Sequence, residues 1–184
     1  PNRPSGDPGP RGRLQDNASN IATFLLDLRD ENKDSYDLIR DTVRMIAPFF
    51  DDFLLEPRKA GQAELVRMEW TQKGSDYPFQ PYQLSDGTIR FICLAAALLQ
   101  PKLPATVVID EPELGLHPFA IGLLANMIQS ASERTQVIIS TQSPALLDYF
   151  DPQDVVVVNR EGGHSTFNRL YPDELREWLA EYSV

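Results

Sequence analysis

The chain has 184 residues, of which 42% are hydrophobic and 24% charged, so it is long enough for one ordinary globular domain and too short for two large ones. Its 27 acidic residues outnumber 17 basic ones, and the net charge of −10 has the wrong sign for binding nucleic acid by bulk electrostatics. No apolar stretch is membrane-spanning in length, and residues 1–13 lack the apolar core of a signal peptide. The single Cys93, within an apolar helical run, indicates a cytoplasmic protein without disulfides and is itself expected to be a small buried hydrophobe.

The first half of the chain is predicted to contain two helices and two strands. Residues 1–15 are rich in Pro and Gly, and we expect them to form a disordered leader or linker. A helix is predicted over 21–28, and Ser35 is a candidate cap for a second helix that stops near Pro48. The face expected to be apolar on this second helix carries Leu38, Ile39, Thr42, Val43 and Ile46.

Two strands, 52–56 and 64–70, are predicted on either side of a turn at Gly61. Successive side chains of the second strand point to opposite faces, and their pattern indicates that one face is covered by other parts of the protein and the other is more exposed to water. The covered set is Val66, Met68 and Trp70, and the wetter set is Leu65, Arg67 and Glu69.

After residue 84 the pattern changes to strands that alternate with helices, which predicts a parallel sheet built from βαβ units. A glycine pair at 162–163 is typical of a hairpin turn. The predicted helices are 88–99, 118–134, 144–150 and one from Pro172 that carries Leu175, Trp178, Leu179 and Tyr182. The predicted strands are 105–109, 136–140, 155–158 and 165–170.

The strand Thr106–Ile109 is followed directly by Asp110, Glu111 and Pro112. An uninterrupted apolar strand is typical of a parallel sheet buried on both faces, and open α/β sheets bind ligands at the carboxyl ends of their strands. Asp110 is therefore a candidate ligand of Mg²⁺, and Glu111 a candidate base for a water that attacks a phosphate. An acidic turn exposed to solvent is the alternative.

Two further segments end at positions where a phosphate could bind. Ser85 and Gly87 precede a helix, whose amino terminus can bind an anion, although an ordinary N-cap with a turn glycine explains the same residues. Gln142 follows the strand 136–140 and is either a sensor of a phosphate or a satisfied loop amide.

Together these segments resemble the carboxyl-terminal half of ABC-type ATPases, in particular the stand-alone predicted ATPases of the AAA/ABC group that are related to RecF and to the heads of structural-maintenance-of-chromosomes (SMC) proteins. Residues 84–88, Leu-Ser-Asp-Gly-Thr, are similar to the signature motif, and 106–112 to the Walker B strand. Residues 113–118 are similar to the loop after Walker B, and 140–144 occupy the switch position. The resemblance implies a P-loop NTPase fold, a mostly parallel sheet flanked by helices, with 16–83 as a helical and β-hairpin segment and 84–184 as the core half.

By this resemblance the cofactors are ATP and Mg²⁺, with Asp110 supporting Mg²⁺, Glu111 as general base and Gln142 in the switch. Ser85 and Gly87 would contact the γ-phosphate of ATP held by a second subunit, so the protein would form a homodimer that sandwiches ATP. Residues 115–117 would lie at the dimer seam.

The sequence departs from the family pattern in three ways. The signature reads Ser-Asp-Gly rather than Ser-Gly-Gly, and the switch has Gln142, which cannot carry a proton, where histidine is common. No G-x-x-x-x-G-K-[ST] segment occurs in the 184 residues. The chain is therefore interpreted as the signature and Walker B half of an ATP hydrolase, inactive by itself, and the alternative is a slowly hydrolysing ATP-gated clamp that acts on DNA or a partner protein and involves no membrane.

Overall fold

The computed structural model describes residues 12–60 and 63–169, and the chain divides into two compact units, residues 1–141 and 142–184. Residues 1–11 of the predicted leader and the helix predicted from Pro172 lie outside the described residues. No helix in the described ranges combines the length and apolar composition that crossing a bilayer requires.

The first unit begins with the two predicted helices, α1 (Ile21–Glu31) and α2 (Lys33–Ile46). The cap of α2 is Asn32 and not Ser35, because the Asn32 side chain accepts a hydrogen bond from the Ser35 backbone N–H. The face that α2 buries also differs from the predicted one: Leu38 is 51% exposed. The residues that α2 buries are Tyr36, Ile39 and Val43.

Five short strands follow and form two antiparallel sheets. Strands β1 (Phe50–Leu54), β4 (Glu69–Gln72) and β5 (Ser75–Phe79) make a three-stranded sheet in the order β1-β4-β5. Strands β2 (Pro57–Ala60) and β3 (Ala63–Val66) form an antiparallel pair on either side of residues 61–62, which lie outside the described residues. The strand predicted over 52–56 corresponds to β1, and β2 was not predicted. The predicted long strand 64–70 is thus divided between two sheets.

The predicted covered face of this segment is confirmed, since Val66, Met68 and Trp70 are buried. On the other face Glu69 is only 3% exposed, whereas we predicted it to be wet. Its carboxylate accepts hydrogen bonds from Arg58 and from Gln80, both at 2.7 Å, so that its charge is paired where it is buried.

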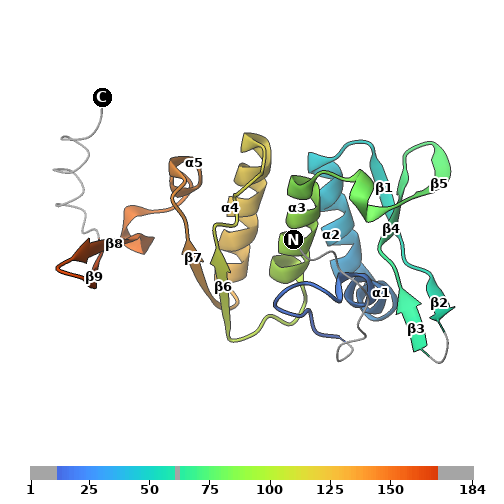
Figure 1. Cartoon of the computed structure of the whole chain (residues 1–184), viewed down its shortest axis with the longest axis horizontal. Coiled ribbons are helices and arrows are strands. Elements are labelled where there is room, and N and C mark those ends of the chain that lie inside the picture. The colour runs from blue at the N-terminus through green and yellow to red at the C-terminus, as the bar shows by residue number, and fades with distance from the viewer. Residues whose placement is uncertain (1–11, 61–62, 170–184) are drawn as a thin grey trace. The chain divides into compact units, whose positions relative to one another are not determined.

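The second half of this unit consists of a helix followed by a β-strand, a second helix and another β-strand, and the last three of these form a βαβ segment. After the short 3₁₀ turn Pro81–Gln83 come α3 (Asp86–Leu99), β6 (Thr106–Asp110), α4 (Pro118–Ser132) and β7 (Gln136–Ser140). Strands β6 and β7 pair in parallel, with Thr106 opposite Gln136 and Asp110 opposite Ser140. Helices α2, α3 and α4 lie side by side between the antiparallel strands and the β6–β7 pair (Figure 1).

This parallel pair is covered on one face only. Val107 is buried, but Val108 is 71% and Ile138 48% exposed, and both point to the opposite face of the pair. The prediction that the Walker-B-like strand is buried on both faces is therefore wrong for the described residues, because α4 packs against one face of the β6–β7 pair and the other face is exposed. The mostly parallel sheet is not found either: β6–β7 is parallel, whereas the other pairings among the described residues are antiparallel.

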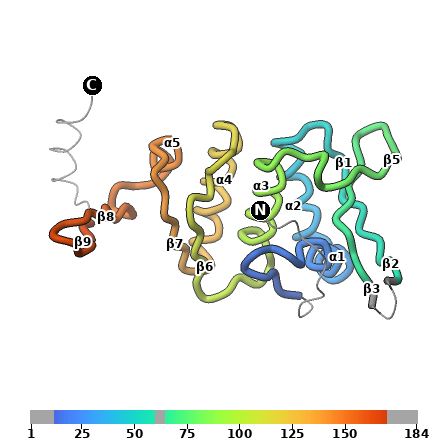
Figure 2. Tube along the Cα trace, in the orientation of Figure 1, coloured from blue at the N-terminus to red at the C-terminus, as the bar shows by residue number. Residues whose placement is uncertain are grey.

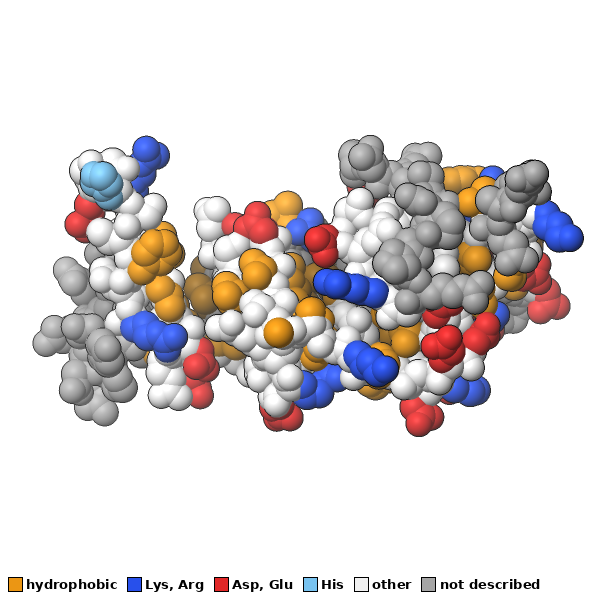
Figure 3. All heavy atoms as spheres, turned by 90° about the horizontal axis from the view of Figure 1, so that it is seen from below, with side chains coloured by type: hydrophobic (Ala, Val, Ile, Leu, Met, Phe, Trp, Pro, Cys, Tyr) orange, Lys and Arg blue, Asp and Glu red, His pale blue; other side chains and the backbone are white. Residues whose placement is uncertain are grey.

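The second unit contains α5 (Pro144–Leu147), a 3₁₀ turn (Pro152–Asp154) and a hairpin of β8 (Val156–Glu161) and β9 (His164–Arg169). The predicted turn at 162–163 is confirmed, and both glycines have positive φ. The strand predicted over 155–158 is thus half of a hairpin and not a third parallel strand. Hydrophobic side chains are exposed on the hairpin (Figure 3), namely Val156, Val158 and Phe167.

Candidate functional site

Ser85 lies at the amino terminus of α3, as the sequence predicts. Its hydroxyl oxygen accepts a hydrogen bond from the Thr88 backbone N–H at 3.1 Å, which makes it the N-cap, and lies 2.8 Å from the Thr88 hydroxyl. Helix geometry leaves the N–H groups of the first turn without intrahelical acceptors, and Ser85 itself is exposed. The N-cap interpretation is confirmed, and it leaves this exposed helix terminus suited to an anion.

Gly87 is required for a reason that the sequence did not reveal. A Cβ atom built on Gly87 would lie 2.3 Å from the backbone oxygen of Gly115, in the loop after β6. Gly115 has a φ of +79°, a conformation that glycine adopts without strain. The structure shows Gly87 making room for the loop after β6, and the predicted contact of Gly87 with a phosphate stays a prediction.

Asp110 lies at the carboxyl end of β6, directly opposite Ser140 on β7, and accepts a hydrogen bond from the Ser140 hydroxyl. Its side chain is exposed. No group of three or more candidate metal ligands occurs within residues 12–60 and 63–169. Mg²⁺ commonly takes one or two carboxylates and completes its shell with water and substrate phosphates, so that an exposed Asp110 fits such a site.

Glu111 has a backbone conformation that few non-glycine residues adopt, with a φ of +45°. Its N–H donates to the Ser140 carbonyl at 2.9 Å and thereby continues the β6–β7 ladder. Its carbonyl accepts from the Leu114 N–H at 3.2 Å, which starts the turn that leads to Gly115. Glu111 is therefore the residue at which the strand turns into the loop.

Arg90, on α3, is a residue of this region that the sequence analysis missed. Its guanidinium donates from Nη2 to the Glu111 carbonyl at 2.6 Å and to the Asp110 carbonyl at 3.3 Å. The signature-like helix and the Walker-B-like loop are thus joined twice, by Arg90 and by the contact of Gly87 with Gly115. The only sequence signal was a basic residue one turn beyond the Gly87 motif, in a helix that is otherwise mostly apolar.

The sequence analysis also did not predict that the side chain of Glu113 is buried. It is only 7% exposed, and one carboxylate oxygen accepts a hydrogen bond from the Thr141 hydroxyl. The other oxygen, Oε2, is buried without a hydrogen-bond partner among the described residues. This buried carboxylate ties the loop after β6 to the end of β7.

His117 is the N-cap of α4: its Nδ1 accepts a hydrogen bond from the Phe119 N–H at 3.2 Å. Gln142, the predicted switch residue, is the first residue of the second unit. The structure therefore brings together Ser85, Gly87, Asp110 and Glu111 in one unit, and the role of Gln142 stays a prediction.

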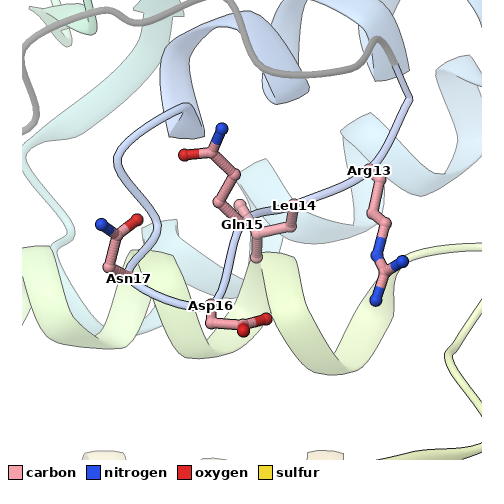
Figure 4. Close-up of a pocket in the computed structure, with 5 residues that line it drawn as sticks. All are labelled: Arg13, Leu14, Gln15, Asp16 and Asn17. Atoms are coloured by element: carbon pink, nitrogen blue, oxygen red, sulfur yellow. The ribbon is translucent and has the colours of Figure 1, made fainter.

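A pocket of about 450 Å³ lies away from these motifs. It is lined by consecutive residues of the segment before α1, Arg13 to Asn17 (Figure 4). Backbone hydrogen bonds hold this segment, since Gln15 N–H donates to the Asn20 side chain and Asn20 donates to the Arg13 carbonyl. None of the signature-like or Walker-B-like residues lines it.

Comparison with known proteins identifies a family and individual relatives. The family described as "AAA domain, putative AbiEii toxin, Type IV TA system" matches residues 7–148. A protein of Mycoplasma genitalium, "Putative ABC transporter ATP-binding protein MG303", is 27% identical over 108 residues. That match covers 56% of this chain and 28% of the relative, so the chain spans well under half of the curated relative's length.

Solved structures of SMC heads share the fold. A structure described as "Structural biochemistry of ATP-driven dimerization and DNA stimulated activation of SMC ATPases" has a TM-score of 0.61 at 17% identity, with 86% of this chain and 96% of that chain covered. The Smc head domain of Pyrococcus yayanosii also has a TM-score of 0.61 at 17% identity, with 91% and 32% covered. A third, "Crystal structure of the SmcHead bound to the C-winged helix domain of ScpA", has a TM-score of 0.59 at 16% identity, with 85% and 51% covered. These similarities show an α/β fold of the P-loop NTPase type.

The family match, over residues 7–148, covers well over half of the chain. The chain therefore belongs to the family described as "AAA domain, putative AbiEii toxin, Type IV TA system".

Proposed function

We propose that this chain is the signature and Walker B half of an ABC-type ATPase that hydrolyses ATP to ADP and phosphate. The observation that supports this most is the double connection between α3 and the loop after β6, through Arg90 and through Gly87 with Gly115. It joins the residue proposed to bind a phosphate, Ser85, to the residue proposed to activate water, Glu111. The proposal keeps residues 16–83 as the segment that leads to the signature and 84–184 as the core half.

In this proposal the groups at the end of β6 have separate tasks. Asp110 holds Mg²⁺, whose charge offsets the negative charge of the transferring phosphoryl group. Glu111 accepts the proton of the attacking water, and Gln142 orients that water by hydrogen bonding, since an amide cannot carry the proton. Ser85 and the first-turn N–H groups of α3 bind the γ-phosphate of an ATP molecule held by a second copy of the protein.

The P-loop that cradles the β- and γ-phosphates is proposed to lie in polypeptide outside residues 1–184. The chain contains no P-loop motif. In addition, Val108 and Ile138 expose apolar side chains on one face of the β6–β7 pair, as is typical of a sheet face that is covered by further structure. We therefore expect residues 1–184 alone to bind Mg-ATP only weakly, because the lysine and backbone nest of the P-loop supply most phosphate contacts. Isothermal titration calorimetry on the purified chain tests this, and micromolar affinity would contradict it.

The direct test of the proposed chemistry is Glu111→Gln in the protein that contains both this chain and a P-loop. The amide has the shape of the carboxylate but does not accept the proton, so turnover should fall by about 10²- to 10⁴-fold while ATP binding persists. Glu133→Gln, at the exposed carboxyl end of α4, is the matched control and should keep parental turnover. Near-parental hydrolysis by Glu111→Gln would show that this carboxylate is not the base.

A second candidate function, an ATP-gated clamp with slow hydrolysis, is favoured by Gln142 in place of a protonatable switch residue. One SMC neighbour is described by DNA-stimulated activation and another is bound to part of ScpA, so DNA or an effector protein is the proposed cargo. Figure 3 shows acidic and basic side chains interspersed on the face it draws, with no continuous basic area there. Turnover measured with and without DNA separates the two functions, since the clamp predicts slow hydrolysis that responds to its cargo.

A further inference from the structure

The side chain of Arg90 contacts the loop after β6 at the peptide that carries Glu111. Nη2 donates to the Glu111 carbonyl at 2.6 Å, within the short range of charge-assisted hydrogen bonds, and more weakly to the Asp110 carbonyl at 3.3 Å. Both acceptors are backbone atoms, so Arg90 contacts the frame that carries the two carboxylates rather than the carboxylates themselves.

The Glu111 backbone needs such support. A φ of +45° in a residue with a Cβ persists only where the surroundings enforce it. The N–H bond to Ser140 fixes this residue to β7, and the Leu114 N–H fixes its carbonyl to the following turn. Arg90 adds a third hydrogen bond to the Glu111 peptide. This bond comes from α3, the helix whose N-cap is Ser85.

We propose that Arg90 is a positioning residue that holds the left-handed Glu111 peptide and thereby sets where the Glu111 carboxylate points. The inference rests on the proposed role of Glu111 as general base. Arg90 touches neither water nor phosphate in this account; it makes the placement of Glu111 depend on α3, whose amino terminus is proposed to bind the partner's ATP. A displacement of about 1 Å in a reacting group can cost on the order of 100-fold in rate, so a constraint on the backbone is enough to matter.

A purely structural role is the competing explanation, and the chain contains a matched control for it. Arg134, just beyond α4, donates to the carbonyls of Leu98 and Gln100 at 2.9 and 3.1 Å, at the other end of α3. Arg90→Met and Arg134→Met each remove an arginine that donates to two backbone carbonyls and joins α3 to another segment. Only the first lies next to Glu111.

The expected result for Arg90→Met, in the protein with its P-loop, is a fall in kcat of roughly 10- to 100-fold with the KM for ATP within about twofold of the parent. Arg134→Met should lower the melting temperature by about as much as Arg90→Met does, but it should leave kcat unchanged. Arg90→Lys, which retains one charged donor, should recover part of the rate. Equal effects of the two methionine variants on kcat, or a raised KM with unchanged kcat, would overturn the proposal.

The dependence on Glu111 is tested by combining variants. If Arg90 acts through Glu111, Arg90→Met should lower the residual turnover of Glu111→Gln by less than about threefold, since residues that act as a unit are not additive. A full 10- to 100-fold loss in the Glu111→Gln background would mean that Arg90 acts by another route, and would overturn the proposal.

A measurement on the 184-residue chain separates this inference from the proposed function. Amide hydrogen exchange at Glu111 and at Leu114, which donates to the Glu111 carbonyl, should be at least about tenfold faster in Arg90→Met than in Arg134→Met. Equal exchange in the two variants would overturn the positioning role whether or not ATP is hydrolysed. If the complete protein lacks ATPase activity but exchange differs as expected, the proposed function fails while the support of the Glu111 peptide by Arg90 stands.

Discussion

An arginine forms hydrogen bonds at each end of α3, but one arginine donates to carbonyls at the end of α3 and the other belongs to α3 and donates to a loop. At the carboxyl end Arg134 reaches in from beyond α4 and satisfies the carbonyls of Leu98 and Gln100, groups that a helix terminus leaves without intrahelical partners. At the amino end Arg90 reaches out from α3 itself to carbonyls of the loop after β6. The first contact completes a helix, whereas the second uses a helix to hold a loop.

This difference shows which end of α3 is committed to the candidate site. The amino end carries an exposed N-cap serine, a glycine packed against Gly115, and an arginine that supports a left-handed glutamate. Arg90 and the contact of Gly87 with Gly115 bring residues 85–90 and 110–115 together, although about twenty residues separate these two segments of the trace in Figure 2. At the carboxyl end Arg134 donates to Leu98 and Gln100, neither of which is a motif residue.

The largest expected effect of breaking the amino-end arrangement comes from Gly87→Ala. Glycine to alanine inside a helix ordinarily stabilises a protein by up to about 1 kcal/mol. Here the new methyl group would meet the Gly115 oxygen at 2.3 Å, a backbone atom that cannot rotate away, so we expect a loss of about 1–3 kcal/mol in the free energy of unfolding. Urea denaturation of the 184-residue chain measures this; a variant that is as stable as the parent, or more so, would show that the loop can move away from α3 at little cost.

Much of the fold around this site follows from the sequence, and the reasons for the exceptions are specific. The strand β7, the hairpin turn at 162–163 and the start of α4 at Pro118 were predicted because period, cap and turn residues act locally. The cap of α2 and the burial of Glu69 were predicted wrongly, because Asn32 competes with Ser35 for the same helix end and because Arg58 and Gln80 reach Glu69 from distant positions.

The candidate site likewise contains residues that local sequence patterns predict and residues that they do not. Ser85, Asp110 and Glu111 stand at ends of elements that local patterns reveal. Arg90, Glu113 and the reason for Gly87 depend on which loop packs against α3, and contacts between residues about 20 to 30 positions apart leave no local pattern in a single sequence.

The smallest expected effect concerns Cys93, in the middle of α3. Burial raises the pKa of the Cys93 thiol from an ordinary 9.0 to about 11, so at pH 8 the reactive thiolate should be about 100-fold scarcer than for a free thiol. If both ends of α3 are held, labelling by a thiol reagent should be slow in the folded chain and should rise with pH up to about 11, whereas in urea it should become fast. Rapid labelling of the folded chain at pH 8 would show that α3 opens readily and that its two ends hold it less firmly than the contacts indicate.

The central claim is that Ser85 completes the ATP site of a second subunit while Glu111 serves the site of its own. Mixing two inactive variants of the protein with its P-loop, Ser85→Arg and Glu111→Gln, tests it most directly. In a mixed dimer one site combines an intact Ser85 with an intact Glu111, so turnover should recover in part, up to about a quarter of the parental rate per subunit if dimers form at random, because half of the dimers are mixed and each has one of two sites intact. No recovery, in mixtures shown to contain mixed dimers, would contradict a shared site, and Ser85 would then be no more than the N-cap of α3.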